Sequence, residues 1–167
     1  MPEPIIEALL AFLTMVFAHE VGTSEFYVVF GCTLLGVVVV ARLLAGVFKS
    51  PKGIFVAVFA VALPFIVGAV GYVSVELYAL PQIEADWAAA YLPWSVFGIV
   101  VFVAALLLSA KLWGIGKGVS VFILILSGLA GMGAHYGAQL MLGIMDTGTS
   151  QIEQREERLN LEIEKAN

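Results

Sequence analysis

The sequence predicts an all-α membrane protein in which four transmembrane helices form a bundle of two antiparallel hairpins. The composition, four long apolar runs and two short turns support this prediction. The 167 residues are 61% hydrophobic and 13% charged, and the mean hydropathy is +1.01. Soluble domains carry about a quarter of their residues as charges. Because a chain of this size has too little interior to bury so much apolar surface in water, we expect lipid to be its solvent.

The four apolar runs cover approximately residues 24–48, 53–80, 93–113 and 119–145. A helix crosses a bilayer in about 20 residues, so each run is long enough. Pro64 interrupts the second run and is expected to kink it, since apolar sequence continues on both sides. The segments "KSPKG" and "WGIGKG" leave room only for tight turns, so successive helices are expected to pair as hairpins within a domain of residues 21–146.

Positive charges predict the orientation of the spans. Lysines flank both tight turns, whereas the N-terminal segment and the loop "PQIEADWAAAYLP" contain neither Lys nor Arg. The positive-inside rule therefore places the turns in the cytoplasm and both termini outside. The size and short loops favour a bacterial inner membrane. Seven residues are predicted interface anchors, through long cationic side chains or amphipathic rings: Arg42, Lys49, Lys52, Trp87, Trp94, Lys111 and Trp113.

Residues 1–20 predict an amphipathic helix that lies in the outer interface. Only about 15 residues between Glu3 and His19 are apolar, which is short for a crossing. Lipid-binding interfacial helices usually carry Lys or Arg on the polar face, and this helix carries none. We therefore expect it to pack against the spans or a partner. The alternative is a fifth span.

Residues 147–167 form a charged tail with the pattern of a second short helix. Ser150 and Glu153 match the capping box that starts helices. A thin apolar stripe follows, and Arg158 is one turn from Glu162. The members of the stripe are Ile152, Leu159 and Ile163. The tail is either a solvated terminal helix or a handle that docks on a partner.

Small residues in the fourth run predict close helix packing. Gly133 and Gly137 form a GxxxG motif, which allows two helix backbones to approach in lipid. Six residues are the predicted packing surface: Ser127, Gly131, Gly133, Ala134, Gly137 and Ala138. The sequence does not distinguish another helix of this chain from a second copy as the partner.

Glu76 and His135 are the candidate polar pair within the membrane. Counting along the helices places both near the outer third of the bilayer, and Gln139 shares a face with His135. The pair could be a hydrogen bond between helices, a site for a proton or ion, or no contact at all. His19 and His135 are the only histidines, so haem ligation by both is an alternative, although we expect no cofactor.

No other stretch predicts chemistry. The chain lacks the common hydrolase and nucleotide-binding motifs, a ligand cluster for a metal and a basic cluster for nucleic acid. Cys32 is the single cysteine, so no disulfide forms within the chain. The leading hypothesis is a non-catalytic subunit or scaffold of a larger membrane assembly, as a homo-oligomer or with other membrane subunits. The competing hypothesis is a small oligomeric transporter or channel that uses Glu76 and His135.

Overall fold

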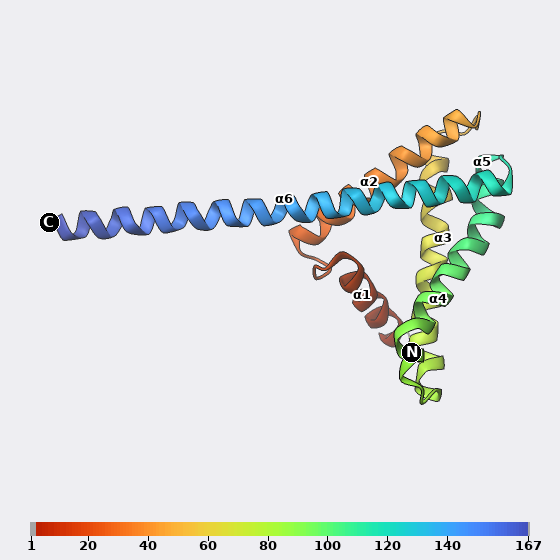
Figure 1. Ribbon diagram of the computed structural model, residues 1–167, viewed down its shortest axis with the longest axis horizontal. Coiled ribbons are helices and arrows are strands. Elements are labelled where there is room, and N and C mark those ends of the chain that lie inside the picture. The colour runs from red at the N-terminus through yellow and green to blue at the C-terminus, as the bar shows by residue number, and fades with distance from the viewer. Residues whose placement is uncertain (1–2, 167) are drawn as a thin grey trace.

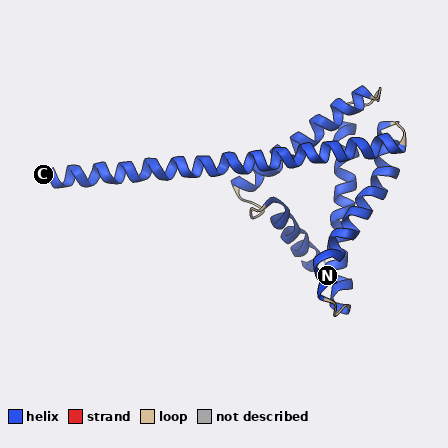
Figure 2. Cartoon of the chain, in the orientation of Figure 1, coloured by secondary structure: helices blue, strands red, loops and turns tan. Residues whose placement is uncertain are grey.

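The computed structural model describes residues 3–166 as a set of helices joined by short loops (Figures 1 and 2). The α-helices are α1 (Glu3–Phe17), α2 (Ser24–Val47), α3 (Ile54–Ser74), α4 (Asp86–Ala104), α5 (Ala110–Trp113) and α6 (Lys117–Ala166). A π-helical turn (Val75–Ala79) and a 3-10 turn (Leu80–Gln82) extend α3, and a second π-helical turn (Ala105–Ser109) joins α4 to α5.

Four of these helical segments are long and apolar enough to cross a membrane. They are Ser24–Val47, Ile54–Gln82, Asp86–Trp113 and Lys117–Met145. The number and approximate positions of the four long apolar helices predicted from the sequence are therefore confirmed. Pro64 lies inside α3 without ending it. α1 is shorter than these segments and apolar.

The third span begins earlier than the sequence predicted. α4 starts at Asp86, so Trp87 and Tyr91 belong to a helix and not to an extended loop. Pro93 was expected at the start of the span and lies inside it. Alanines at 88–90 favour the helix, and an interior proline is tolerated where neighbouring helices surround it. The connection between the second and third long helices is therefore only residues 83–85.

The helices associate as two pairs that differ from the predicted hairpins. α2 packs along α6, and α3 packs along α4. The tight turns do connect α2 to α3 and α5 to α6, but the helices diverge after each turn (Figure 1). The two pairs converge at the end of the molecule where α5 lies and separate toward the other end, where α1 lies across the gap (Figure 1). We call the converging end the junction.

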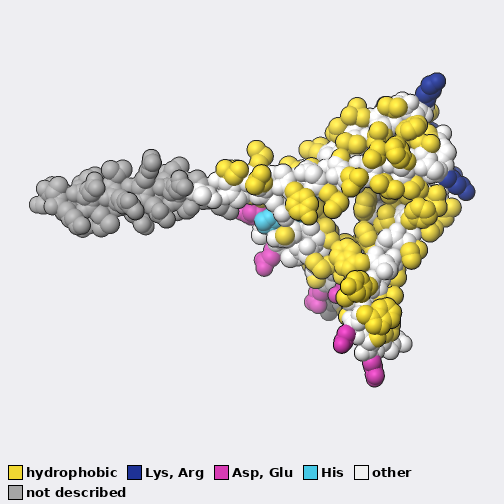
Figure 3. Space-filling view, in the orientation of Figure 1, with side chains coloured by type: hydrophobic (Ala, Val, Ile, Leu, Met, Phe, Trp, Pro, Cys, Tyr) yellow, Lys and Arg dark blue, Asp and Glu magenta, His cyan; other side chains and the backbone are white. Residues whose placement is uncertain are grey.

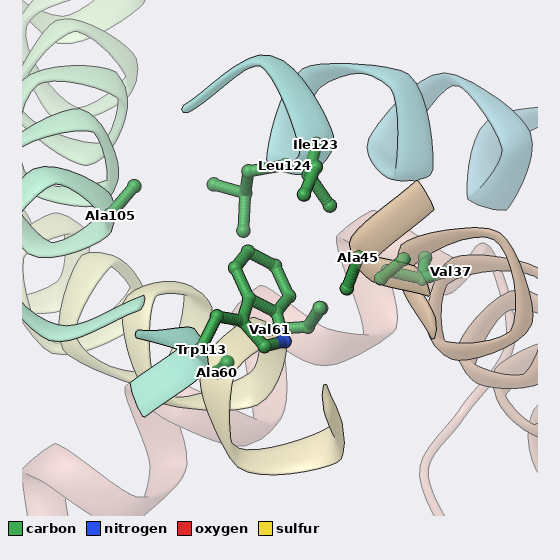
Figure 4. Packing of buried hydrophobic residues seen from close by; sticks show 9 residues of the cluster. Val37, Ala45, Ala60, Val61, Ala105, Trp113, Ile123 and Leu124 are labelled. Atoms are coloured by element: carbon green, nitrogen blue, oxygen red, sulfur yellow. The ribbon is translucent and has the colours of Figure 1, made fainter. Parts of the chain in front are cut away.

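The largest buried cluster occupies the junction. It joins Ala41 and Ala45 of α2, Val61 of α3, Trp113 of α5 and Ile123 of α6, among others (Figure 4). All four predicted spans therefore contribute to one core. Smaller clusters lie under the two ends of α1.

α6 is one continuous helix through the predicted tail. Its backbone runs from Lys117 to Ala166 and extends well beyond the other helices (Figure 1). The prediction that a separate helix starts at Ser150 is therefore wrong. Extending an existing helix needs no new nucleation, and the sequence between Met145 and Ser150 contains no proline to stop it. The predicted tail contacts, Ile152, Leu159 and Ile163 included, lie outside the side chains that the structure describes.

Candidate functional site

The structure places Glu76 and His135 on different helix pairs. Glu76 is exposed in the π-helical turn that extends α3, and this turn packs against α3 and α4. His135 is half-buried on α6, where its ring lies 5.9 Å from the Phe17 ring and 5.5 Å from the Tyr136 ring. Gln139 is half-buried one turn further along α6. The chain therefore does not bring the candidate pair together, and its aromatic neighbours give His135 a packing role.

The tight packing surface of α6 is formed by only part of the predicted set. Ser127, Gly131 and Ala138 are buried, and Ala134 is half-buried. A methyl group added at Gly36 of α2 would lie 2.8 Å from Ala134 Cβ, and one added at Gly131 would overlap Val37 Cγ2. These glycines therefore permit the contact between α2 and α6.

Gly133 and Gly137 lie on the uncovered side of α6. Both are exposed, and a methyl group added at either would meet no atom within 4 Å. The GxxxG motif consequently makes no contact with another helix of this chain. Successive residues of an α-helix are rotated by about 100° around its axis. Residues 133 and 137 therefore point to a different side from their neighbours Ala134 and Ala138, which belong to the stripe that faces α2.

The predicted cationic anchors gather at the junction end. Lys49, Lys52 and Lys111 are exposed, and Arg42 is half-buried. A methyl group added at Gly46 would lie 3.4 Å from Arg42 Nη1, so the guanidinium reaches one turn toward the end of α2. Helical side chains usually lean toward the N-terminus, and this opposite direction is the one a snorkelling arginine needs.

The predicted aromatic anchors divide into two groups. Trp87 and Trp94 are 65% and 44% exposed near the start of α4, as an interfacial ring should be. Trp113 is only 1% exposed and lies in the junction core (Figure 4). The expectation that Trp113 is an exposed interface anchor is therefore wrong. The indole packs inward because the turn that follows it brings α6 across its ring.

The junction contains serine hydroxyls that donate hydrogen bonds to backbone carbonyls across helices. Proline has no N–H, so Pro64 leaves the carbonyl of Ala60, four residues earlier, without its helical donor. Ser109 Oγ of the second π-helical turn donates to this carbonyl at 2.5 Å, and Ser109 is fully buried. One side chain thus completes a backbone hydrogen bond that the neighbouring helix lacks.

Two further serines act similarly. Ser50, in the turn after α2, donates through Oγ to the carbonyl of Trp113 at 2.8 Å, where α5 ends and the carbonyl has lost its helical partner. Ser120 of α6 donates to the carbonyl of Ala105, the first residue of the π-helical turn, at 3.1 Å. Each bond joins segments that are separate in the chain, so together they fasten the ends of four spans.

Sequence reasoning missed Ser50, Ser109 and Ser120 as a group. The available signal was Pro64, because a proline inside a span predicts an orphan carbonyl four residues earlier. What the sequence does not contain is which serine reaches that carbonyl. Ser127, which was predicted for packing, donates to Leu124 within α6.

The Trp113 indole N–H is the exception among the buried polar groups. It makes no hydrogen bond with any described residue, although the side chain is 1% exposed. Such a group costs about 1–3 kcal/mol. The apolar residues around the ring, with Val61 beside the indole nitrogen in Figure 4, explain why no acceptor is near.

The described residues contain no group of three or more side chains suited to a metal ion. Haem ligation by His19 and His135 stays a hypothesis. His19 is half-buried two residues after Phe17, whose ring lies against His135, so both histidines belong to the same end of the molecule.

Comparison with known proteins leaves the geometry as the only guide to function. No family model, no curated protein and no solved structure matches this chain.

Proposed function

We propose that this chain is a non-catalytic subunit or scaffold of a larger membrane assembly. It spans a bacterial inner membrane four times, with the junction end in the cytoplasm and α1 and both termini outside. The fold supports the coarser part of this proposal, since four helices are compatible with a multi-pass membrane protein.

The side of α6 that no other described helix covers is the observation that supports a partner. Gly133 and Gly137 lie exposed beside Met132, Tyr136 and Leu140. Glycine destabilises a helix interior by up to about 1 kcal/mol relative to alanine. Contacts within this chain do not offset that cost at either position. A partner helix that packs against the two glycines would, because small residues allow the backbone approach on which association in lipid depends.

The extension of α6 supports the same conclusion. Residues 146–166 run past every other helix of the chain (Figure 1). Most of the stability of a helix in a protein comes from tertiary packing. A subunit that binds along or beyond α6 would stabilise it. We propose that the partner is another copy of this chain or a different membrane subunit.

The mass of the native particle tests this proposal. The protein is purified from its own membranes in a mild detergent, and the protein mass is measured with the detergent contribution subtracted. We expect a mass above the 17.8 kDa of one chain. The G137L variant should reduce the mass to one chain. The matched control is G98L, at an exposed position of α4 where an added methyl group meets nothing within 4 Å. A wild-type particle that contains one chain and no other protein would overturn the proposal.

A further inference from the structure

The lysines of the two tight turns lie at one end of the molecule. Ser50 and Trp113 are joined by the buried 2.8 Å hydrogen bond. Lys49 and Lys52 flank Ser50, and Lys111 and Lys117 flank Trp113. All four lysine side chains are exposed. One hydrogen bond and the core beneath it therefore hold two pairs of lysines, more than 50 residues apart in the chain, at the same end of the molecule. We call these four residues the lysine surface.

No acidic side chain that the structure describes belongs to the turns that carry the lysine surface. The described carboxylates lie in α1, in the loop before α2, at the start of α2, in the extension of α3 and around the start of α4. They are Glu7, Glu20, Glu25, Glu76, Glu84 and Asp86. In Figure 3 the visible lysines and the visible carboxylates occupy opposite ends of the molecule. The lysine surface is thus an unneutralised positive charge that attracts anions.

Exposed apolar side chains adjoin the lysine surface. Val47 is 73% exposed and Phe55 is 79% exposed, and both lie within three residues of a lysine in the chain. A free phosphate ion has no apolar part, so it gains nothing from contact with these side chains. An anion that carries an acyl chain can contact both the lysines and the apolar side chains. Its headgroup pairs with the ammonium groups, and its chain covers the apolar side chains.

We propose that the lysine surface binds the headgroups of acidic phospholipids in the adjacent leaflet. The inference rests on the membrane-spanning part of the proposed function and adds a ligand to it. Both tight turns contribute, so binding requires their relative position and not only the total charge. Each lysine near an anionic membrane surface strengthens the attraction by about fivefold.

Lipid retention in native mass spectrometry tests the proposal. The purified protein in detergent is incubated with equal amounts of dioleoyl phosphatidylglycerol and dioleoyl phosphatidylcholine, which differ only in the headgroup. A detergent micelle lacks the anionic surface that gives each lysine its fivefold effect, so the total is smaller than the product of four such effects. We expect retained phosphatidylglycerol to exceed phosphatidylcholine by about tenfold. The quadruple variant K49Q/K52Q/K111Q/K117Q should retain the two lipids equally. The matched control R155Q/R158Q/K165Q removes three positive charges from the end of α6 and should keep the preference.

Two further variants and a competitor sharpen the test. S50A leaves the charge unchanged but removes the hydrogen bond between the turns, and it should lower the preference because the two pairs of lysines are no longer held in place. K49Q/K52Q and K111Q/K117Q should each lose most of it. A quadruple variant that keeps the wild-type preference overturns the proposal, and Lys49 and Lys111 would then serve only the C-terminal ends of α2 and α5. Displacement of phosphatidylglycerol by an equal concentration of inorganic phosphate also overturns it, in favour of a soluble anion.

The two proposals fail in distinguishable ways. A multi-chain particle without lipid preference overturns only the lipid inference. A single-chain particle with the preference overturns only the assembly.

Discussion

Individual residues in this chain satisfy backbone carbonyls that regular helices would satisfy themselves. Pro64 removes a donor from α3, and the end of α5 leaves the carbonyl of Trp113 free. Ser109 and Ser50 replace the missing donors. Both serines are buried, so little water can reach the carbonyls in their place, and these hydroxyls stabilise the junction more than their small size suggests.

A double-mutant cycle between Pro64 and Ser109 tests this account. S109A should lower the free energy of unfolding by about 1 kcal/mol, because the carbonyl of Ala60 loses its donor. P64A returns a backbone N–H to residue 64, so the same S109A change in that background should cost close to zero. Reversible unfolding in mixed micelles measures both values.

Ser74 supplies the control for this cycle. Its Oγ donates to Val70 within the same helix, where the change S74A should have little effect. If the effects of S109A and P64A are additive, the hydroxyl does not replace the missing N–H.

Glycines on α2 and α6 give a second prediction at this scale. G131A should destabilise the pair, because the added methyl group overlaps Val37 Cγ2. G36A should do the same, at 2.8 Å from Ala134 Cβ. We expect each to cost about 1–3 kcal/mol. G133A is the matched control on α6, where the space is open, and should raise the unfolding free energy of the single chain by up to about 1 kcal/mol, because alanine favours a helix more than glycine does. Equal losses at 131 and 133 would contradict the assignment of the faces.

These glycines also show where sequence reasoning reaches its limit. The pattern indicated that α6 packs through small residues, because association in lipid depends on close approach. The predicted set included Gly131 and Ala134, which face α2, and also Gly133 and Gly137, which do not. Every side of α6 carries small residues, so the sequence alone does not indicate which side meets α2. That choice depends on complementary residues of α2, such as Gly36 and Val37.

At the scale of elements, α1 bridges the two helix pairs where they are furthest apart. Phe12 is 6% exposed and lies 4.8 Å from the Tyr72 ring and 6.1 Å from the Trp94 ring, on the α3/α4 pair. Phe17 is 9% exposed and lies 5.5 Å from the Phe26 ring, on the α2/α6 pair. The prediction that this segment packs against the spans agrees with these contacts. Phe12 and Phe17 are about 7.5 Å apart along the axis of α1, so this short part of the helix links the two pairs.

We predict that α1 holds the open ends of the pairs at a fixed distance. F12A and F17A should each broaden the distance distribution between spin labels at positions 24 and 90, because one end of α1 loses its ring contacts. Pulsed electron–electron double resonance measures that distribution, on protein in which Cys32 is replaced by serine. L10A is the control, since Leu10 is 43% exposed and belongs to neither of the buried clusters that contain Phe12 and Phe17. An unchanged distribution in both phenylalanine variants would show that the pairs hold their angle without α1.

The spans themselves were predictable, whereas their pairing was not. Hydropathy identified all four because a bilayer demands a minimum apolar length. The ends of these helices were harder to predict, since the sequence from Asp86 through the following alanines is compatible with either a loop or a helix. The pairing of α2 with α6 depends on contacts between residues nearly 100 positions apart, such as Gly36 with Ala134. No local pattern encodes such a contact.

At the scale of the whole molecule, charge divides the chain into two ends. The described lysines cluster around the junction, and the carboxylates lie toward α1 and the opposite ends of the spans (Figure 3). The structure thereby brings together charges that the sequence presents as two separate turns. The positive-inside rule applied to this division gives the proposed orientation.

Cysteine accessibility in intact cells checks that orientation. With Cys32 replaced by serine, K52C and K117C should resist a membrane-impermeant maleimide until the cells are opened. E20C and A85C should react at once, because the outer ends of the spans face the reagent. Glu20 is exposed and Ala85 is half-buried, so both positions tolerate the change. Labelling of residues 52 and 117 from outside would invert the proposed topology.

The uninterrupted backbone of α6 fixes the distance and direction of its C-terminal end relative to the rest of the helix. From Asp146 to Ala166 it advances about 30 Å, at 1.5 Å per residue. Anything attached at its tip stands at a set height and a set azimuth above the last apolar turn. Removing seven residues lowers the tip by about 10 Å and returns it to nearly the same bearing, whereas removing five swings it about 140° around the axis. The number of residues in this continuous helix therefore determines both how far its end stands from the spans and in which direction that end points.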